Sequence, residues 1–163
     1  MMTDHTSTIQ VSVDLFSAAI RSEDSFFRNL PESVTKEAER RYRMFLALVQ
    51  KYPDEVVSPS KDIDEMWHIH MLHPSAYYED CISNFGYILD HDGGYGSASA
   101  EEWEDLLRIF DRTAALWKKE FGEEYGGDTG IDVVAKCVKA CAKCATKCRT
   151  ACKKQISKRH LVA

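Results

Sequence analysis

Apolar residues recur every three or four positions along most of this 163-residue chain, the spacing of helices that bury one face. Residues 11–30 predict one helix or two short ones, interrupted near residues 22–24. The clearest pattern follows: Ser33 or Thr35 can cap a helix that continues to Tyr52 and stops at Pro53. Its apolar face is Ala38, Tyr42, Phe45, Leu46 and Val49.

Three further helices are predicted downstream. Residues 62–73 lack Gly and Pro and read as a helix ended by Pro74. Residues 75–85 resume the pattern, and Ser99 with Glu102 forms a capping box that opens a helix ending near Phe121. We therefore predict an all-α fold, a compact helical domain with glycine-rich loops and a C-terminal Cys-rich amphipathic helix.

Glycine content and net charge divide the chain into segments. We expect a disordered N-terminus over residues 1–8, a helical domain containing the His/Asp residues over 9–121, a glycine-rich linker over 122–130 and a basic Cys-rich tail over 131–163. Residues 131–163 contain nine Lys/Arg and one Asp, a net charge of +8, whereas the remainder has 12 Lys/Arg and 25 Asp/Glu, a net charge of -13. Opposite charges favour docking of the tail on its own body or on an anionic partner. Nucleic acid is disfavoured, because the tail has no aromatic residue to stack on bases.

The composition favours a cytoplasmic protein. Hydrophobic residues make up 44% of the chain, enough for a core. We find no apolar run near the about 18–20 residues of a membrane span, and residues 1–10 lack the layout of a signal peptide. We therefore expect no membrane association, and six cysteines that are thiols or metal ligands rather than a disulfide framework.

Residues 62–81 concentrate the metal-ligand types. Imidazole and carboxylate groups suit a transition metal such as copper, zinc or iron. On a helix, Asp64 and His68 share a face, whereas His70 falls about 160° from His68, so the two histidines cannot both bind one ion from a regular helix. A site must then recruit from elsewhere, with His91 in the glycine-rich loop as the first choice. The candidate ligands are His68, His70, His73, His91, Asp62, Asp64 and Cys81.

A structural explanation competes with this one. Trp67, Met71, Tyr77 and Tyr78 would pack in the core, and the histidines would hydrogen-bond to buried carbonyls or to nearby carboxylates. If a metal is present with an open position, Asp64 or Glu65 could act as the base in catalysis.

Five cysteines near the C-terminus form a second candidate site. They follow at steps of four, three, four and four residues, so on a helix their sulfur atoms form a single stripe. Thiolates in this arrangement suit copper or zinc, and a second helix from a homo-oligomer could complete the coordination. The alternatives are redox or disulfide chemistry, small hydrophobic residues facing a core, and a substrate modified by a partner enzyme or by the chain's own upstream site. The cysteines are Cys137, Cys141, Cys144, Cys148 and Cys152.

Part of the chain resembles a known family. The motif Asp62-Ile-Asp64-Glu65-Met-Trp67-His68-Ile-His70, with Pro74, Tyr77, Asp80-Cys81, Phe85-Gly86 and His91 after it, is similar to the glycine-rich domain-containing protein-like family. The resemblance covers about residues 37–96 and suggests a small bacterial member. Family members often have a His-His pair where this chain has Asp90-His91. The resemblance implies the domain and no particular reaction.

These observations favour a transition-metal-binding protein, with a His/Asp site in the helical body and a thiolate stripe in the C-terminal helix. The alternatives are a metalloenzyme acting on a small molecule or on peptidyl cysteine, with the tail as substrate or partner, and a non-catalytic protein-interaction module.

Overall fold

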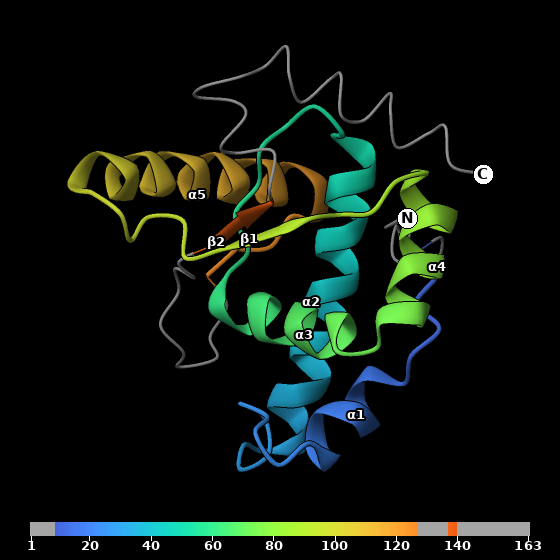
Figure 1. Ribbon diagram of the computed structural model, residues 1–163. Coiled ribbons are helices and arrows are strands. Elements are labelled where there is room, and N and C mark those ends of the chain that lie inside the picture. Colours follow the sequence, from blue (N-terminus) through green and yellow to red (C-terminus); the bar gives the residue numbers. More distant parts are fainter. Residues whose placement is uncertain (1–8, 127–136, 140–163) are drawn as a thin grey trace.

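The computed structural model describes residues 9–126 and the backbone of residues 137–139. These residues form five α-helices and two short strands, so the all-α prediction is confirmed (Figure 1). The helices are α1 (Leu15–Arg21), α2 (Glu32–Lys51), α3 (Lys61–Met71), α4 (Pro74–Phe85) and α5 (Ala100–Phe121), and the strands are β1 (His91–Gly93) and β2 (Cys137–Lys139).

Helix α2 is the centre of the fold. It contacts α1, α3 and α5, and α3 in turn contacts α1 and α4. In Figure 1, α3 crosses α2, while α1 and α5 lie toward opposite ends of α2. The core contains the apolar face predicted for α2, including the fully buried Tyr42 and Phe45, together with Trp67 of α3 and Trp117 of α5.

The predicted helices differ from the structure mainly at their ends. Residues 11–30 contain one helix, α1, capped by the Asp14 side chain, which accepts a hydrogen bond from the Ser17 amide. Helix α2 begins two to four residues earlier than expected, with Pro31 at its N-cap, so the predicted cap at Ser33 or Thr35 is wrong. Proline is favourable at a helix start because it lacks the N–H that the first turn cannot pair.

Only one half of the capping box predicted for α5 forms. The Ser99 hydroxyl accepts a hydrogen bond from the Glu102 amide. The Glu102 carboxylate accepts from the amides of Gly96 and Ala98 rather than from Ser99, so it fixes the preceding loop. Gly96 has a positive φ of 92°, and a β-carbon there would lie 2.6 Å from the Leu106 side chain, so both conformation and space require glycine.

The packed body extends beyond Phe121, at least to Tyr125. The Tyr125 ring is 2% exposed and lies against Phe110 and Trp117, with ring centroids 5.2 and 4.9 Å away. Its hydroxyl donates a hydrogen bond to the Ser58 carbonyl. Part of the segment predicted as a glycine-rich linker therefore belongs to the core.

Strands β1 and β2 are an addition that the helical pattern did not predict. They pair antiparallel, with His91 opposite Lys139, Asp92 opposite Val138 and Gly93 opposite Cys137. The sequence predicted a helix through residues 137–139, whereas their backbone is a strand. Cys141, Cys144, Cys148 and Cys152 lie outside the described residues.

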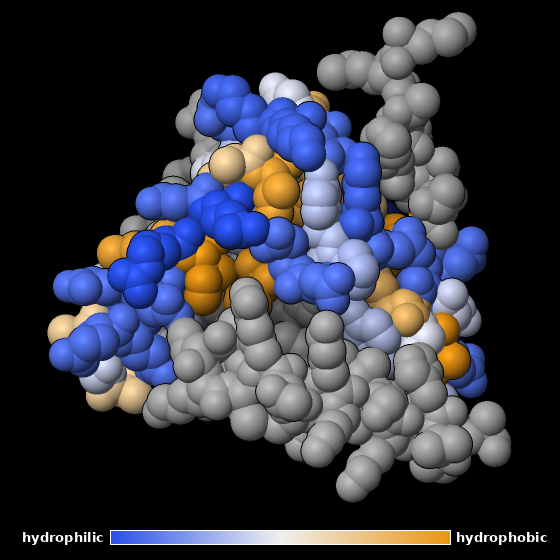
Figure 2. Space-filling model, turned by 90° about the horizontal axis from the view of Figure 1, so that it is seen from above, coloured by the Kyte–Doolittle hydropathy of each residue, from blue (hydrophilic) through white to orange (hydrophobic). Residues whose placement is uncertain are grey.

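The surface agrees with a chain that is 29% charged. On the face shown in Figure 2, hydrophilic residues predominate and apolar residues show between them. Within residues 9–126 and 137–139, no helix combines the length and the apolar character that crossing a bilayer requires.

Candidate metal centre

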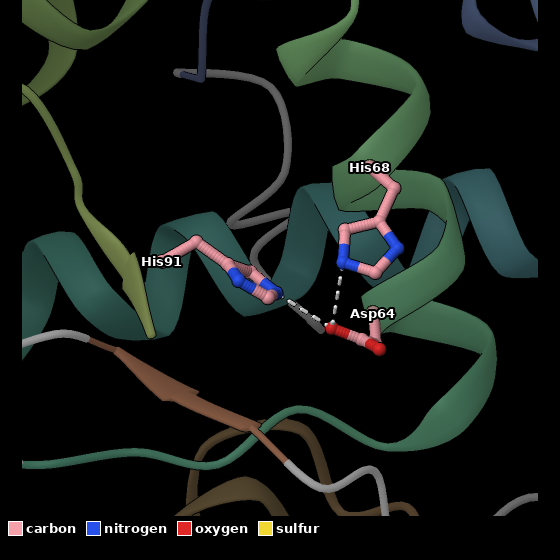
Figure 3. Close-up of side chains that lie close together, drawn as sticks. All are labelled: Asp64, His68 and His91. Carbon is pink, nitrogen blue, oxygen red and sulfur yellow. Dashed lines mark hydrogen bonds and ion pairs between the residues drawn. The ribbon is translucent and has the colours of Figure 1, made fainter. Parts of the chain in front are cut away.

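Three side chains from two elements converge beside the middle of α3. Asp64 and His68 lie one turn apart on the same face of α3, and His91 reaches them from β1 (Figure 3). One ligand atom from each residue lies within 4.8 Å of the other two. The helical spacing predicted the first pair, and the structure adds the histidine from the glycine-rich loop.

Oδ1 of Asp64 is the common point of the cluster. It lies 2.7 Å from Nε2 of His91, which is a hydrogen bond, and 3.6 Å from Nε2 of His68. Donors that bind one zinc-like ion at 2.0–2.2 Å in a tetrahedral arrangement are separated by about 3.3–3.6 Å. His68 already satisfies this spacing, and His91 must move away from Asp64 by about half an ångström.

The cluster lies at the edge of the core. The side chains of Asp64 and His91 are each 7% exposed, whereas that of His68 is 43% exposed. An ion could therefore enter from the side of His68 and exchange ligands with solvent. Three protein donors also leave at least one coordination position for a further ligand.

Helices α3 and α4 position His91. Its ring packs against Trp67, with centroids 4.6 Å apart at 78°. The Trp67 indole N–H donates to the Tyr77 hydroxyl, and that hydroxyl donates to the carbonyl of Leu89, two residues before His91. Because Trp67, Tyr77 and Leu89 are all buried, the position of β1 is fixed by the core.

Glu65 lies beside His68, the second histidine of the cluster, and changes the pKa of its ring. Its Oε2 lies 3.8 Å from Nδ1 of His68, and the Glu65 carboxylate also pairs with Lys61. The neighbouring Glu65 carboxylate is the main cause that raises the pKa of His68, against the opposing effect of partial burial. With Nδ1 turned toward a carboxylate, Nε2 is the nitrogen left for a metal, the common arrangement for a histidine ligand.

His70 belongs to a different network on the opposite face of α3. Its Nε2 lies 3.0 Å from Oδ2 of Asp80, and its Nδ1 lies 2.9 Å from the hydroxyl of Tyr42. Burial is the main cause that lowers the pKa of His70, which favours the neutral ring. A neutral ring donates from Nε2 to Asp80 and accepts from Tyr42 at Nδ1, so both nitrogen atoms have partners.

Asp80 ties this network to the N-terminal segment. Its Oδ2 also accepts hydrogen bonds from the amide and the hydroxyl of Ser12, at 2.8 and 3.1 Å. The sequence did not indicate Tyr42 and Asp80 as partners of His70. The only sequence signal was that Tyr42 lies on the apolar face of α2, which implies a buried hydroxyl that needs a partner.

Asp62 is engaged elsewhere, in a buried ion pair. Its Oδ2 accepts from Nε of Arg41 at 2.6 Å, and its Oδ1 accepts from the Ser60 hydroxyl at 2.6 Å. The Arg41 guanidinium also donates to the Tyr125 carbonyl and lies over the rings of Trp117 and Tyr125. Asp62 therefore connects α3 to α2 and the end of the body.

The two remaining body candidates also lie outside the three-residue cluster. Nδ1 of His73 donates to the Ile69 carbonyl at 2.9 Å. Cys81 is 2% exposed and has no disulfide partner among the side chains that the structure describes, and burial is the main cause that raises the pKa of its thiol. A buried, protonated thiol behaves as a small apolar residue.

Comparison with known proteins gives the family of the first half of the chain. Residues 2–80 match the family model described as glycine-rich domain-containing protein-like. Residues 2–80 belong to this family. The resemblance noted in the sequence is thereby confirmed, although the matched segment begins and ends earlier than residues 37–96. The glycine-rich domain-containing protein-like segment includes Asp64 and His68 and ends before His91.

Two plant proteins match the chain. Glycine-rich domain-containing protein 1 of Arabidopsis thaliana is 30% identical over 118 residues, which cover 67% of this chain and 14% of that protein. Glycine-rich domain-containing protein 2 of the same plant is 33% identical over 91 residues, which cover 53% of this chain and 11% of that protein. The chain thus spans a small part of the length of these relatives. No solved structure matches it.

Proposed function

We propose that this protein binds a divalent transition-metal ion through Asp64, His68 and His91. The observation that carries the proposal is the convergence of three potential ligand atoms within 4.8 Å of one another, from residues 27 positions apart in sequence. Two imidazoles and one carboxylate are donors that suit zinc, iron or copper.

The orientation of the rings supports metal binding over an ordinary hydrogen-bonded pair. A simple hydrogen bond between His91 and Asp64 would not require a second imidazole to face the same carboxylate. His68, however, also turns Nε2 toward the same carboxylate oxygen while Nδ1 faces Glu65. Two imidazole nitrogen atoms directed at one carboxylate oxygen are the arrangement that a shared cation would bridge, and a carboxylate behind a ligand histidine is its usual support.

The five tail cysteines are a second metal-binding feature of the proposal, as thiolate ligands for copper or zinc. Because four of them lie outside the described residues, this part depends on their spacing in the sequence. Catalysis by Asp64 or Glu65 also remains a prediction from the sequence, since the site geometry specifies no substrate.

Titration calorimetry with zinc tests the body site. To separate it from the tail, the experiment uses the full chain with Cys141, Cys144, Cys148 and Cys152 changed to Ser, termed here the four-serine chain. We expect one ion per chain, with at least about tenfold weaker binding after His91→Ala or His68→Ala, because loss of a ligand should cost no less than loss of a residue supporting a ligand.

His73→Ala is the matched control for the calorimetry. His73 lies near the same helix, and its ring already bonds to the Ile69 carbonyl, so its loss should leave zinc binding unchanged. Absence of zinc, cobalt and copper binding in the four-serine chain, or equal binding by the His91→Ala variant, would refute the proposed function.

A further inference from the structure

The candidate metal centre is a three-donor site rather than a closed one. Among the residues that the structure describes, the ligand atoms of Asp64, His68 and His91 converge as a group of three. Glu65 is the nearest further carboxylate, but it lies beside Nδ1 of His68 and pairs with Lys61. It supports a ligand instead of adding one. Structural zinc sites are closed by four protein ligands, whereas sites that react keep a position open.

The open side of the centre faces solvent at His68. The side chains of Asp64 and His91 are almost fully buried, and the His91 ring packs against the buried Trp67 ring. The His68 ring is nearly half exposed, and its centroid lies 4.8 Å from that of His91. Coordination positions that protein atoms do not take are therefore reached from the side of His68.

The donor set indicates which ion would use such positions. Two imidazoles and one carboxylate, with further positions open, are the arrangement in which proteins hold non-haem iron(II). Iron(II) and copper ions, unlike zinc, also take part in oxygen and one-electron chemistry. A carboxylate in the donor set favours iron(II) over copper(I), which prefers thiolates and thioethers.

We propose that the centre binds iron(II) and that a small diatomic molecule binds directly to this iron on the side of His68. This inference rests on the proposed function and deepens it, because it names the ion and the class of its exogenous ligand. The diatomic molecule displaces a water molecule from the iron, so one iron–water bond breaks as one iron–ligand bond forms. Zinc at the same three residues would not bind a neutral diatomic molecule in this way.

Nitric oxide is the probe for the open position. Its complex with high-spin iron(II) gives an electron paramagnetic resonance signal that neither partner gives alone. The experiment uses the four-serine chain with Cys137→Ser added, because exposed thiolates also react with iron and nitric oxide. Cys81 stays, since it is buried outside the cluster. With one iron(II) per chain and oxygen excluded, we expect the iron-nitrosyl signal at about one per chain.

Variants in this five-serine chain assign the signal to the cluster. His91→Ala and His68→Ala should each remove it, with at least about tenfold weaker iron(II) binding. Because the His68 ring is half exposed, His68→Ala keeps the test valid if loss of His91 unfolds the chain. His73→Ala is the matched control and should retain the signal, since its ring bonds to the Ile69 carbonyl. Circular dichroism establishes that the helical content of each variant equals that of the parent.

The possible failures separate the inference from the proposed function. Iron(II) that binds at His68 without giving the nitrosyl signal overturns the open position and leaves metal binding standing. Binding of zinc without binding of iron(II) overturns the choice of ion and again leaves metal binding standing. A signal of equal intensity in His68→Ala and in the parent overturns the inference, because the iron is then held elsewhere. Absence of iron, zinc, cobalt and copper binding refutes both.

Discussion

The two faces of α3 place the same residue types in opposite settings. Asp62 and His70 lie on the side packed against α2 and α4, where Arg41, Tyr42 and Asp80 satisfy their polar atoms. Asp64 and His68 lie toward β1, where they meet His91 at the edge of the core. A shift of two residues along the helix rotates a side chain by about 200°.

Residue type alone therefore does not identify a metal ligand in the motif of residues 62–70. Each face carries an aspartate and a histidine, yet the buried pair is held by protein groups and the other pair converges with a third donor. Changes on the buried face should therefore affect stability without affecting metal content, and changes on the other face should do the reverse.

Asp62→Ala should have the largest effect on stability. It leaves the Arg41 guanidinium, which is 2% exposed, without its carboxylate partner. Breaking one partner of a buried ion pair costs about 3–5 kcal/mol. Urea denaturation followed by circular dichroism measures the loss. The control is Asp64→Asn, for which we expect a loss of about 1 kcal/mol, the scale of a single hydrogen bond. Equal losses in the two variants would contradict the assignment of the faces.

His70→Ala should have the second-largest effect on the free energy of unfolding. The substitution leaves the Tyr42 hydroxyl and one hydrogen-bonding site of Asp80 without their partner in the core, and it creates a cavity. We expect a decrease of about 2–4 kcal/mol in the free energy of unfolding. His68→Ala serves as the comparison, because that ring is 43% exposed and should cost about 1 kcal/mol or less. The difference between the two denaturation midpoints decides the prediction.

The pH dependence of stability should show the smallest effect. Burial lowers the pKa of His70 below its ordinary value of 6.5, so the unfolded chain binds a proton more readily than the folded one. This contribution to stability is present above pH 6.5, and it is lost as the pH falls below 6.5 and through the lower pKa of the folded state. The raised pKa of His68 acts in the opposite direction, stabilising the folded state below pH 6.5.

Denaturation of the native chain and of His70→Gln from pH 7.5 to about 5 isolates the contribution of His70. The native chain should lose more stability than the variant over this range, because the variant has no imidazole at position 70. A native chain that gains stability relative to the variant on acidification would show that His70 is charged in the folded state.

The sequence predicted the helices because their apolar spacing reflects the core directly. It also separated His68 from His70, because two positions on one helix have a fixed angular relation. It did not find the partners of His70 and Asp62, since Tyr42, Asp80 and Arg41 come from other helices and their distances depend on how the helices pack. Tyr125 was missed for a similar reason: the glycines around it resemble a linker, but its ring fills a space between α5 and α2.

The strands show another limit of the sequence pattern. Three-residue strands are too short for a recognisable alternation, and the cysteine spacing favoured a helix. The pairing of β1 and β2 depends on contacts between residues 44 to 48 positions apart, which no local pattern contains.

Metal content of two single variants is the most direct test of the central claim. The four-serine chain, with His68→Ala or with His70→Ala, is expressed with zinc, purified under reducing conditions and analysed for bound metal per chain. We predict that the parent and the folded fraction of His70→Ala retain about one ion and that His68→Ala loses most of it. Loss of metal in the His70→Ala protein with retention in the His68→Ala protein would contradict the account, because it would place the site on the buried face of α3.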